Sequence, residues 1–460
     1  MLNLRLADIA RWTGGRLHGT DATITTVSTD TRALEPGMLF VALAGEHHDA
    51  HDFAASARER GAAALLVNRE LAVELPQVIV ADTRIALGEL ARAVRAQRSA
   101  RVVGITGSNG KTTVKTLLAS ILALHGRTHV NAGNFNNEIG LPLTLLAMPA
   151  TSEYAVLEMG AGKPGDIDYL ARIAAPQVAV VNNVAAAHLE RMGTLTGVAE
   201  TKGAIYRALP ADGIAVINAD DAFAGYFASI AAPRRMLTFG LLHRADVGAD
   251  LDIGTGRFRL LTPVGNTEIA LPLPGRHNVM NALAATALAL ALGVPLTTIK
   301  LGLEQAPNVS GRLARRVHAS GAVVIDDSYN ANPGSFAAAI ATLASESGER
   351  VLVMGDMGEL GPDAQRLHAE VGALAKRSGV QRLRAVGRLS RAAVDAFGGG
   401  AQHYEDQAQL VEALRGELRG GVALLVKGSR SSAMDRVVRA LHADGSQGDT
   451  DENGGERHAA

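Results

Sequence analysis

The sequence predicts an α/β protein with three domains, and three observations lead to this prediction. The chain has 460 residues, which at roughly 150 residues per domain corresponds to about three domains. Short and almost continuously apolar segments alternate with helical segments, as in parallel sheets that are covered by helices on both faces. A glycine-rich turn at residues 107–113, between a predicted strand and a predicted helix, is typical of a P-loop. The predicted domains are 1–99, 100–308 and 309–445, and a polar, disordered tail is predicted at 446–460.

The N-terminal domain is expected to have a mixed α/β fold. Apolar runs at residues 38–43, 64–67 and 78–80 predict buried strands. A helix is predicted at 85–96, and the polar residues 97–99 that follow it mark the expected boundary with the next domain.

The central domain is expected to contain a parallel sheet built around the glycine-rich turn. The segment 250–273 has strand-like patches and predicts an antiparallel addition to this domain. The predicted strands of the parallel sheet are 101–106, 154–158, 178–182 and 214–218, and predicted helices are 111–125 and 282–292.

The C-terminal domain repeats the alternation of strands and helices. We therefore expect a second, doubly wound Rossmann-like unit. The predicted strands are 322–326, 351–354, 383–386 and 422–426, and the predicted helices are 335–345, 363–376 and 407–418.

Composition and charge exclude several classes of protein. The formal net charge is −1, which argues against binding to nucleic acid, since neutralising many phosphates needs clustered Lys and Arg. The chain has no cysteine, so disulfides and Cys-ligated zinc are excluded. The N-terminus carries Asp8 and Arg11 and does not resemble a signal peptide, and no apolar run reaches the roughly 18 residues of a membrane span. A cytoplasmic monomer is expected.

The strand–turn–helix at residues 106–113 is the strongest local signal for a nucleotide, expected to be ATP. Its glycines let backbone N–H groups surround phosphate oxygens, and the helix N-terminus adds its positive dipole end. Lys111 would reach the β- and γ-phosphates, and the hydroxyl of Thr112 would bind Mg²⁺. The longer form of this loop has a glycine where Ile105 stands, so the match is to the shorter Gly-x-x-Gly-Lys-Thr-Thr form. The alternative is a glycine turn that caps a helix and carries a solvated lysine. The residues expected to contact the nucleotide here are Gly107, Ser108, Asn109, Gly110, Lys111, Thr112 and Thr113.

Residues 106–113 resemble the nucleotide loop of the Mur ligases and of the related folylpolyglutamate synthases. The resemblance extends over almost the whole chain, from residues 29–32 to residues 427–430. It implies an ATP-dependent ligase of bacterial cell-wall precursor synthesis, which forms an amide bond through an acyl phosphate. The first domain would then bind a UDP-linked precursor and the central domain ATP.

The resemblance also implies two Mg²⁺ ions and their ligands. Glu158 ends a predicted strand, so its carboxylate can meet a metal at the carboxyl edge of the sheet together with Thr112. His188 matches a second metal ligand. Lys202 matches a lysine that CO₂ converts into a carbamate, which turns a cation into an anion with two oxygens. Taken without the resemblance, these three residues are also compatible with a solvated strand end, a structural histidine and a solvated helix position.

Further residues are expected at ATP because they match positions of the family. Asn278 and Asn281, near the start of a predicted helix, match residues that contact adenine, although an Asn at this place also fits a helix cap. Arg312 matches the arginine that reaches the γ-phosphate, and Asp327 matches the aspartate that binds the ribose. Both belong to the third domain, so domain closure is expected to complete the site and exclude water. The residues expected to take part in catalysis are Lys111, His188, Lys202 and Arg312.

The kind of ligase follows from segments outside the loop. Residues 28–32 resemble the UDP-binding domains of the two later Mur ligases, a domain that folylpolyglutamate synthases lack. The segments 327–333 and 354–361 resemble the ligase that adds D-alanyl-D-alanine to UDP-N-acetylmuramoyl-tripeptide, and 131–142 resembles the substrate loop. The residues expected to bind these substrates are Ser28, Asp30, Thr31, Arg32, Asn134, Asn137, Tyr329, Asn330, Asn332, Lys427 and Arg430.

Two other functions stay open at the level of the sequence. One is the Mur ligase that adds a single amino acid, commonly meso-diaminopimelate or lysine, to the dipeptide precursor. The other is a non-catalytic, nucleotide-gated regulator, which would use the loop without needing Glu158, His188 and Lys202 together.

Overall fold

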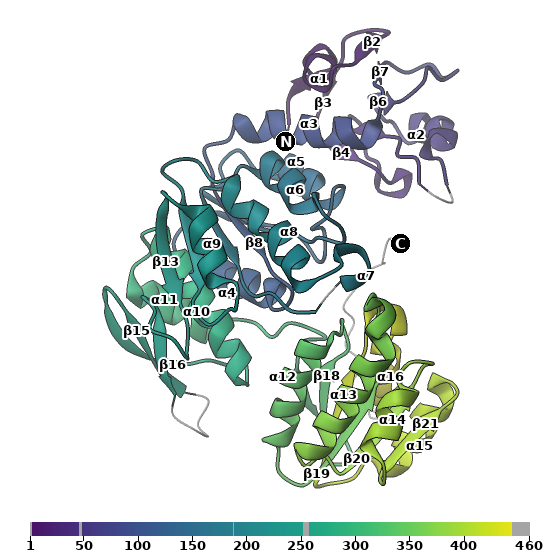
Figure 1. The fold of residues 1–460 in the computed structure, drawn as a ribbon. Coiled ribbons are helices and arrows are strands. Elements are labelled where there is room, and N and C mark those ends of the chain that lie inside the picture. The colour runs from purple at the N-terminus through teal and green to yellow at the C-terminus, as the bar shows by residue number, and fades with distance from the viewer. Residues whose placement is uncertain (1, 46–47, 187, 252–256, 444–460) are drawn as a thin grey trace. The chain divides into compact units, whose positions relative to one another are not determined.

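The computed structural model describes residues 2–45, 48–186, 188–251 and 257–443. Contacts between these residues form two compact units (Figure 1). The first unit contains the chain up to Ala185 together with Arg191–Pro307, and the second contains Ala186–Glu190 together with the chain from Asn308 onward. The predicted tail at 446–460 lies outside the described residues. Within the described ranges, every helix is too short or too polar to span a bilayer.

The N-terminal part of the first unit contains a five-stranded sheet in the order β2-β7-β6-β5-β4. Strands β4 to β7 are parallel neighbours, and β2 pairs antiparallel with β7, so the predicted mixed α/β fold is confirmed. The central strand is apolar throughout because both of its faces are covered. The elements of this part are β1 (Leu4–Arg5), α1 (Leu6–Thr13), β2 (Arg16–His18), β3 (Thr23–Ile24), β4 (Val27–Ser28), η1 (Thr31–Ala33), β5 (Leu39–Val41), η2 (Ala50–Phe53), α2 (Ala54–Glu59), β6 (Ala64–Val67), β7 (Gln77–Ile79) and α3 (Thr83–Ala96).

Helix α3 attaches this part to the rest of the first unit. The carboxylate of Asp82 caps its start by accepting hydrogen bonds from two backbone N–H groups. Near its end, the buried Arg95 donates through Nε to the carbonyl of Ala174, at 3.0 Å. Ala174 is the last residue of α6 (Asp166–Ala174), so the guanidinium satisfies a carbonyl that a helix end leaves open.

The main sheet of the first unit has six parallel strands in the order β13-β12-β11-β8-β10-β9. Helices α4 and α10 pack on one face, and α6, α8 and α9 on the other, while α11 packs against α4 and β16 (Figure 1). This arrangement brings the carboxyl ends of β8, β10, β11 and β12 to one edge. The further elements are β8 (Arg101–Thr106), α4 (Lys111–Ala123), β9 (Thr128–Val130), α5 (Gly140–Ala147), β10 (Tyr154–Glu158), β11 (Val178–Val181), α7 (Leu189–Met192), α8 (Leu195–Arg207), β12 (Ile214–Asn218), α9 (Ala224–Ala231), β13 (Arg235–Phe239), α10 (Arg276–Ala291) and α11 (Leu296–Glu304).

The predicted antiparallel addition is a separate three-stranded sheet, β14-β15-β16. Its strands are β14 (Gly248–Leu251), β15 (Arg257–Thr262) and β16 (Gly265–Ala270), and residues 252–256 between the first two lie outside the described residues. The inward side chains Phe258, Leu260 and Ile269 join the core that α4 and α10 share with the main sheet.

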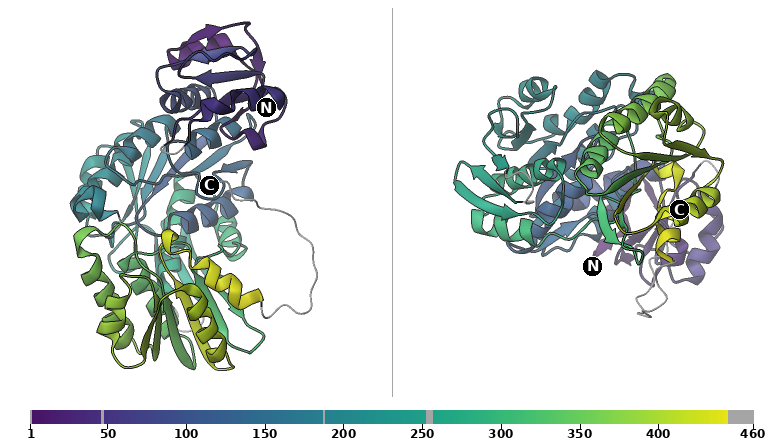
Figure 2. Two further views of the ribbon diagram at one scale, coloured as in Figure 1. Left: turned by 90° about the vertical axis from the view of Figure 1, so that its right-hand side faces the viewer. Right: turned by 90° about the horizontal axis from the view of Figure 1, so that it is seen from below.

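The second unit contains a six-stranded sheet in the order β17-β18-β22-β19-β20-β21. Only β17 is antiparallel to its neighbour, so the predicted doubly wound unit is confirmed, with an added edge strand. Figure 2 shows these strands between green helices and yellow helices. The elements are β17 (Ala314–Val317), β18 (Val323–Asp327), α12 (Pro333–Ala344), β19 (Glu349–Met354), η3 (Gly361–Asp363), α13 (Ala364–Arg377), β20 (Arg382–Val386), α14 (Arg391–Phe397), β21 (Ala401–Tyr404), α15 (Gln407–Glu417), β22 (Val422–Lys427), η4 (Arg430–Ser432) and α16 (Asp435–Ala443).

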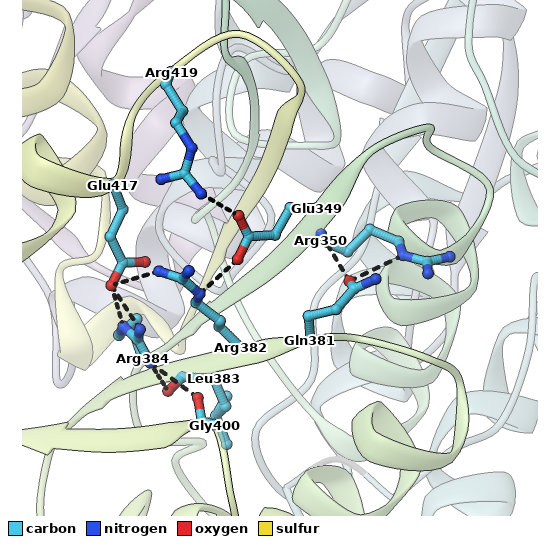
Figure 3. A network of polar contacts seen from close by, with 9 residues as sticks. All are labelled: Glu349, Arg350, Gln381, Arg382, Leu383, Arg384, Gly400, Glu417 and Arg419. Atoms are coloured by element: carbon cyan, nitrogen blue, oxygen red, sulfur yellow. Dashed lines mark hydrogen bonds and ion pairs between the residues drawn. The ribbon is translucent and has the colours of Figure 1, made fainter.

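An ionic cluster lies where β19 and β20 begin, at the amino edge of this sheet (Figure 3). Arg384 donates through Nε and Nη2 to one oxygen of Glu417, at 2.7 and 2.6 Å, and its side chain is only 9% exposed. Glu349 is paired with Arg382 at 2.5 Å and with Arg419 at 2.6 Å. The cluster connects two strands with the end of α15 and stabilises the edge opposite the strands' carboxyl ends.

Replacing Arg384 with Met is expected to destabilise the second unit. The substitution leaves the carboxylate of Glu417 without its nearest cation in a largely buried place. We expect the free energy of unfolding to fall by about 3 kcal/mol, the lower end for a broken buried pair, because Arg382 remains 3.7 Å from this carboxylate. Arg439→Met is the control, because Arg439 and Asp435 form an exposed pair on α16, and a change below about 0.5 kcal/mol is expected. Chemical denaturation followed by circular dichroism measures both, and equal effects would contradict a stabilising role of the cluster.

Candidate active site

The glycine-rich turn connects β8 to α4 at the carboxyl edge of the main sheet. Gly110 has φ +80° and precedes the first residue of α4, Lys111. A Cβ atom on Gly110 would lie 2.3 Å from Oδ1 of Asn281, and one on Gly107 would lie 3.0 Å from Cβ of Asn182. Both positions therefore require glycine. The N-cap is a glycine without a side-chain cap, and the positive end of the helix dipole of α4 lies directly after the turn, as in sites that bind anions.

Two polar side chains of the loop are already oriented by the fold. Nζ of Lys111 donates to the carbonyl of Gly107 at 2.9 Å, so the lysine folds back along the turn. Oγ1 of Thr112 donates to Oε2 of Glu158 at 2.8 Å. The structure thus brings together the predicted phosphate-binding lysine and the two residues predicted to bind the first Mg²⁺.

Glu158 is the buried centre of this part of the site, with 3% exposure. Nζ of Lys115 lies 3.5 Å from its Oε2, and Nδ2 of Asn136 donates to its Oε1 at 2.8 Å. The described residues contain no group of three His, Cys, Asp or Glu side chains that would hold a metal alone. A hydroxyl and one carboxylate fit Mg²⁺, which typically takes few protein oxygens and completes its shell with phosphate and water.

Asparagine side chains hold the turn against the neighbouring strands and α10. Asn183 accepts from the backbone N–H of Asn109 at 2.9 Å and donates to its carbonyl at 3.1 Å. Asn182 donates to the same carbonyl at 2.9 Å and to Oδ1 of Asn281 at 3.0 Å. Asn278 accepts from Asn281 at 3.2 Å. The two residues predicted at adenine therefore belong to the network that shapes the phosphate loop.

The alternative interpretation of Asn278 as a helix cap does not hold. The N-cap of α10 is Gly275, and Asn278 lies within the first turn. Its side chain donates to the carbonyl of Pro274 at 2.7 Å.

Lys202 lies on α8 and is buried, with 2% exposure, so it is not a solvated helix residue. Burial, and after it the positive charge of Lys111, lower the pKa of its amine to about 7. A substantial fraction of the amine is therefore neutral at neutral pH, which is the form that reacts with CO₂.

His188 is grouped by its contacts with the second unit, as are the first two residues of α7, which follows it in sequence. Its Nδ1 is paired with the carboxylate of Glu359, and both residues have a left-handed backbone, at φ +55° and +59°. Lys202 and the glycine-rich turn belong to the first unit, so the predicted metal ligands divide between the two units.

In the second unit, predicted residues gather where β18 and β22 end. Nζ of the buried Lys427 donates to Oδ2 of Asp327 at 2.6 Å and to the carbonyl of Asn330 at 2.9 Å. Burial raises the pKa of Asp327, an effect that the charge of Lys427 opposes. The guanidinium of Arg312 lies 4.5 Å from the ring centre of Tyr329.

The other predicted residues of the second unit have distinct positions. The guanidinium of Arg430 lies 5.9 Å from the ring centre of Tyr329. Oδ1 of Asn332 accepts from the backbone N–H of Ser335 at 2.8 Å and caps α12. Asn332, which the sequence predicted only as a substrate-binding residue, thus also has a structural role as the cap of this helix.

The predicted substrate residues of the first unit form two groups. Asp30 and Arg32 make a bidentate pair, at 3.0 and 2.8 Å, which holds the pKa of Asp30 below its usual value. Ser28 accepts from the backbone N–H of Asp30 at 3.1 Å, and Thr31 begins the short helix η1. These residues form one compact turn at the end of β4.

The second group lies in the segment 131–142. Asn137 accepts from the N–H groups of Ile139 and Gly140 and so shapes the start of α5, while Asn134 lies in an exposed turn. Asn136, which the sequence did not single out, donates to the carboxylate of Glu158.

The geometry defines a P-loop α/β protein that carries a carboxylate and a buried lysine at the carboxyl edge of its main sheet. Families of Mur ligase domains match the chain in three places. They are the Mur ligase family, catalytic domain, at residues 23–99, the Mur ligase middle domain at 105–289, and the Mur ligase, glutamate ligase domain at 311–430.

Individual relatives match along nearly the whole chain. UDP-N-acetylmuramoyl-tripeptide–D-alanyl-D-alanine ligase of Escherichia coli (strain K12) is 46% identical over 97% of this chain and 100% of its own length. The crystal structure of MurF from Acinetobacter baumannii has a TM-score of 0.91 at 35% identity, covering 96% of this chain and 100% of that one. MurF ligase from Thermotoga maritima, in complex with ADP, has a TM-score of 0.82 at 28% identity, covering 91% and 97%. The chain belongs to the Mur ligase family, as its resemblance predicted.

Replacing Gly110 with Ala is expected to weaken nucleotide binding at least tenfold, since the methyl group collides with Asn281 and the backbone is left-handed. Gly225→Ala is the matched control, because no atom lies within 4 Å of a Cβ atom on Gly225, in α9. Titration with a fluorescent ATP analogue measures both variants. Wild-type affinity in Gly110→Ala would contradict the phosphate-binding role of the turn.

Proposed function

We propose that this protein joins D-alanyl-D-alanine to UDP-N-acetylmuramoyl-tripeptide and converts ATP to ADP and phosphate. The observation that carries the proposal is the P-loop whose Thr112 contacts Glu158, in a chain of which 90–97% aligns with ligases named for this reaction. The ADP bound by the Thermotoga maritima relative supports ATP as the nucleotide. No contact described above favours the ligase that adds a single amino acid.

The reaction requires activation of a carboxylate. The tripeptide carboxylate attacks the γ-phosphorus of ATP, ADP leaves, and an acyl phosphate forms. The neutral amine of D-alanyl-D-alanine then attacks the acyl carbon, and phosphate leaves as the amide bond forms and the amine loses a proton. Lys111 and the N–H groups at the start of α4 would stabilise the charge of the transferring group, and Arg312 is proposed to act on the γ-phosphate. Protein groups mainly position the reactants and stabilise charge.

The residues present fit one Mg²⁺ at Thr112 and Glu158, and a second ion is proposed at His188 and a carbamylated Lys202. Bound Mg²⁺ supplies positive charge that neutralises the phosphoryl oxygens. An uncarbamylated lysine offers no oxygen, so the second site depends on the modification. In that step the neutral amine of Lys202 attacks the carbon of CO₂, a C–N bond forms, and one proton is released.

Other assignments belong to the same proposal. We infer domain boundaries at 1–99, 100–308 and 309–445, which are compatible with the three matched families. Residues 28–32 would bind the UDP-linked precursor, Asn278 and Asn281 the adenine, and Asp327 the ribose.

Parallel assays with different acceptors test the reaction. With UDP-muramoyl-tripeptide, ATP and Mg²⁺, we expect ADP release that depends on D-alanyl-D-alanine. With UDP-muramoyl-dipeptide and either meso-diaminopimelate or lysine, we expect no release above the background. Release only in the second pair of assays would assign the protein to the ligase that adds one amino acid, and release in neither would reject the function.

Carbamylation of Lys202 is expected to increase with pH. Because the pKa of the amine is about 7, its neutral fraction rises from about one tenth at pH 6 to about nine tenths at pH 8. At a fixed concentration of dissolved ¹³CO₂, a ¹³C carbamate resonance should therefore grow over this range, and Lys202→Ala should lack it. A Lys202→Ala protein with full ligase activity would rule out the carbamate role.

A further inference from the structure

Lys115 is a buried lysine whose position on α4 is one turn beyond Lys111. Its side chain is 7% exposed, and its neighbours Val114 and Leu118 on the same helix are fully buried. An ammonium group is costly to bury unless opposite charge and hydrogen-bond acceptors surround it. The function proposed above does not use Lys115.

The contacts of Lys115 connect three parts of the site. Its Nζ lies 3.5 Å from Oε2 of Glu158 and donates to the carbonyls of Asn131 and Gly133, at 2.9 and 3.0 Å. One side chain thus touches the helix that begins at the phosphate loop, the candidate metal ligand and the segment 131–136.

The same segment is attached to Glu158 by two asparagine side chains. Asn131 accepts from the backbone N–H of Glu158 at 3.0 Å and donates to its carbonyl at 3.1 Å. Asn136 donates to the carboxylate at 2.8 Å. The side chains of Lys115, Asn131 and Asn136 thus connect the segment 131–136 to Glu158. Of these three side chains, Lys115 is the one that carries a positive charge.

We propose that Lys115 is a positioning residue that links divalent-cation binding at Glu158 to the conformation of the segment 131–136. Its positive charge offsets the charge of Glu158 and so weakens the attraction of the carboxylate for a cation. Its two carbonyl contacts hold the segment in place. A cation that binds Glu158 competes with Lys115 for the same oxygen, so metal binding and the anchoring of the segment affect each other. The roles of Mg²⁺ and of the substrate segment rest on the proposed function, whereas the contacts themselves do not.

Two substitutions separate the charge of Lys115 from its geometry. Lys115→Met removes the charge and both carbonyl contacts. Lys115→Arg keeps the charge but cannot place a compact ammonium between the three acceptors. Lys300→Met is the control for loss of one positive charge, because Lys300 lies on α11 and pairs with Glu304.

The first measurement is hydrogen exchange of the backbone amides of residues 131–136 in the protein without ligands. We expect exchange at least roughly tenfold faster in Lys115→Met and faster in Lys115→Arg, and no change in Lys300→Met. The second is binding of Mn²⁺ alone, followed by electron paramagnetic resonance, with Glu158→Gln identifying the site. We expect affinity to increase by roughly tenfold in Lys115→Met and to stay within about twofold in Lys115→Arg.

In Lys115→Met, faster amide exchange together with tighter Mn²⁺ binding indicates a positioning role. General damage to the fold would also speed exchange, but it would weaken Mn²⁺ binding. Unchanged exchange in Lys115→Met, or Mn²⁺ affinity that is unchanged or lower, would overturn the proposal. Mn²⁺ binding that Glu158→Gln does not reduce would also overturn it. If circular dichroism shows that Lys115→Met does not fold, the proposal is tested by amide exchange in Lys115→Arg, and unchanged exchange in this variant would overturn it. Neither readout uses ligase activity, so a failed acceptor assay would reject the proposed function while leaving this result intact.

Discussion

The negative charge of a buried carboxylate has to be balanced by hydrogen-bond donors and positive charge. Much of the candidate site follows from the groups that do this for Glu158. The carboxylate ends the strand β10 in a place that water scarcely reaches. The fold surrounds it with a hydroxyl from Thr112, an ammonium from Lys115 and an amide from Asn136. Because Thr112 and Lys115 are on the helix that follows the phosphate loop, compensation of one charge also sets the position of this helix relative to its neighbouring strand.

The parts of the site that could be predicted from sequence are those where local pattern and chemistry coincide. The strand β8, the glycine turn and α4 follow from an apolar run, from glycines that a crowded backbone requires, and from a helical segment. The position of Glu158 at the carboxyl edge of the sheet follows from its place at the end of the predicted strand 154–158. The short strands β1 to β4 escaped prediction because two or three residues carry no measurable periodicity. The edge strands β17 and β21 were missed because their residues are largely polar and form no apolar run.

Other features depend on contacts between segments that are distant in sequence. Lys202 resembles any helical lysine in the sequence, and only the packing of α8 shows that it is buried with a lowered pKa. Asn136 and Asn183 are ordinary polar residues until the fold brings them to Glu158 and Asn109. A signal did exist for Lys115, because a lysine between apolar helix positions is unusual. The family resemblance supplied the roles of His188 and Arg312, which neither composition nor spacing suggested.

In the second unit, the ionic cluster and the predicted site residues lie at opposite edges of one sheet. The ionic cluster of Arg384 and Glu417 lies where the strands begin (Figure 3). Asp327 and Lys427, in contrast, end the strands β18 and β22. Side chains at the carboxyl end can therefore be exchanged while the cluster at the other end continues to stabilise the unit. Such a division increases tolerance to mutation at the carboxyl edge, since natural proteins have little stability to spare and a change there leaves the contribution of the cluster intact. The fold of this unit is in this sense suited to changes of the side chains at its carboxyl edge.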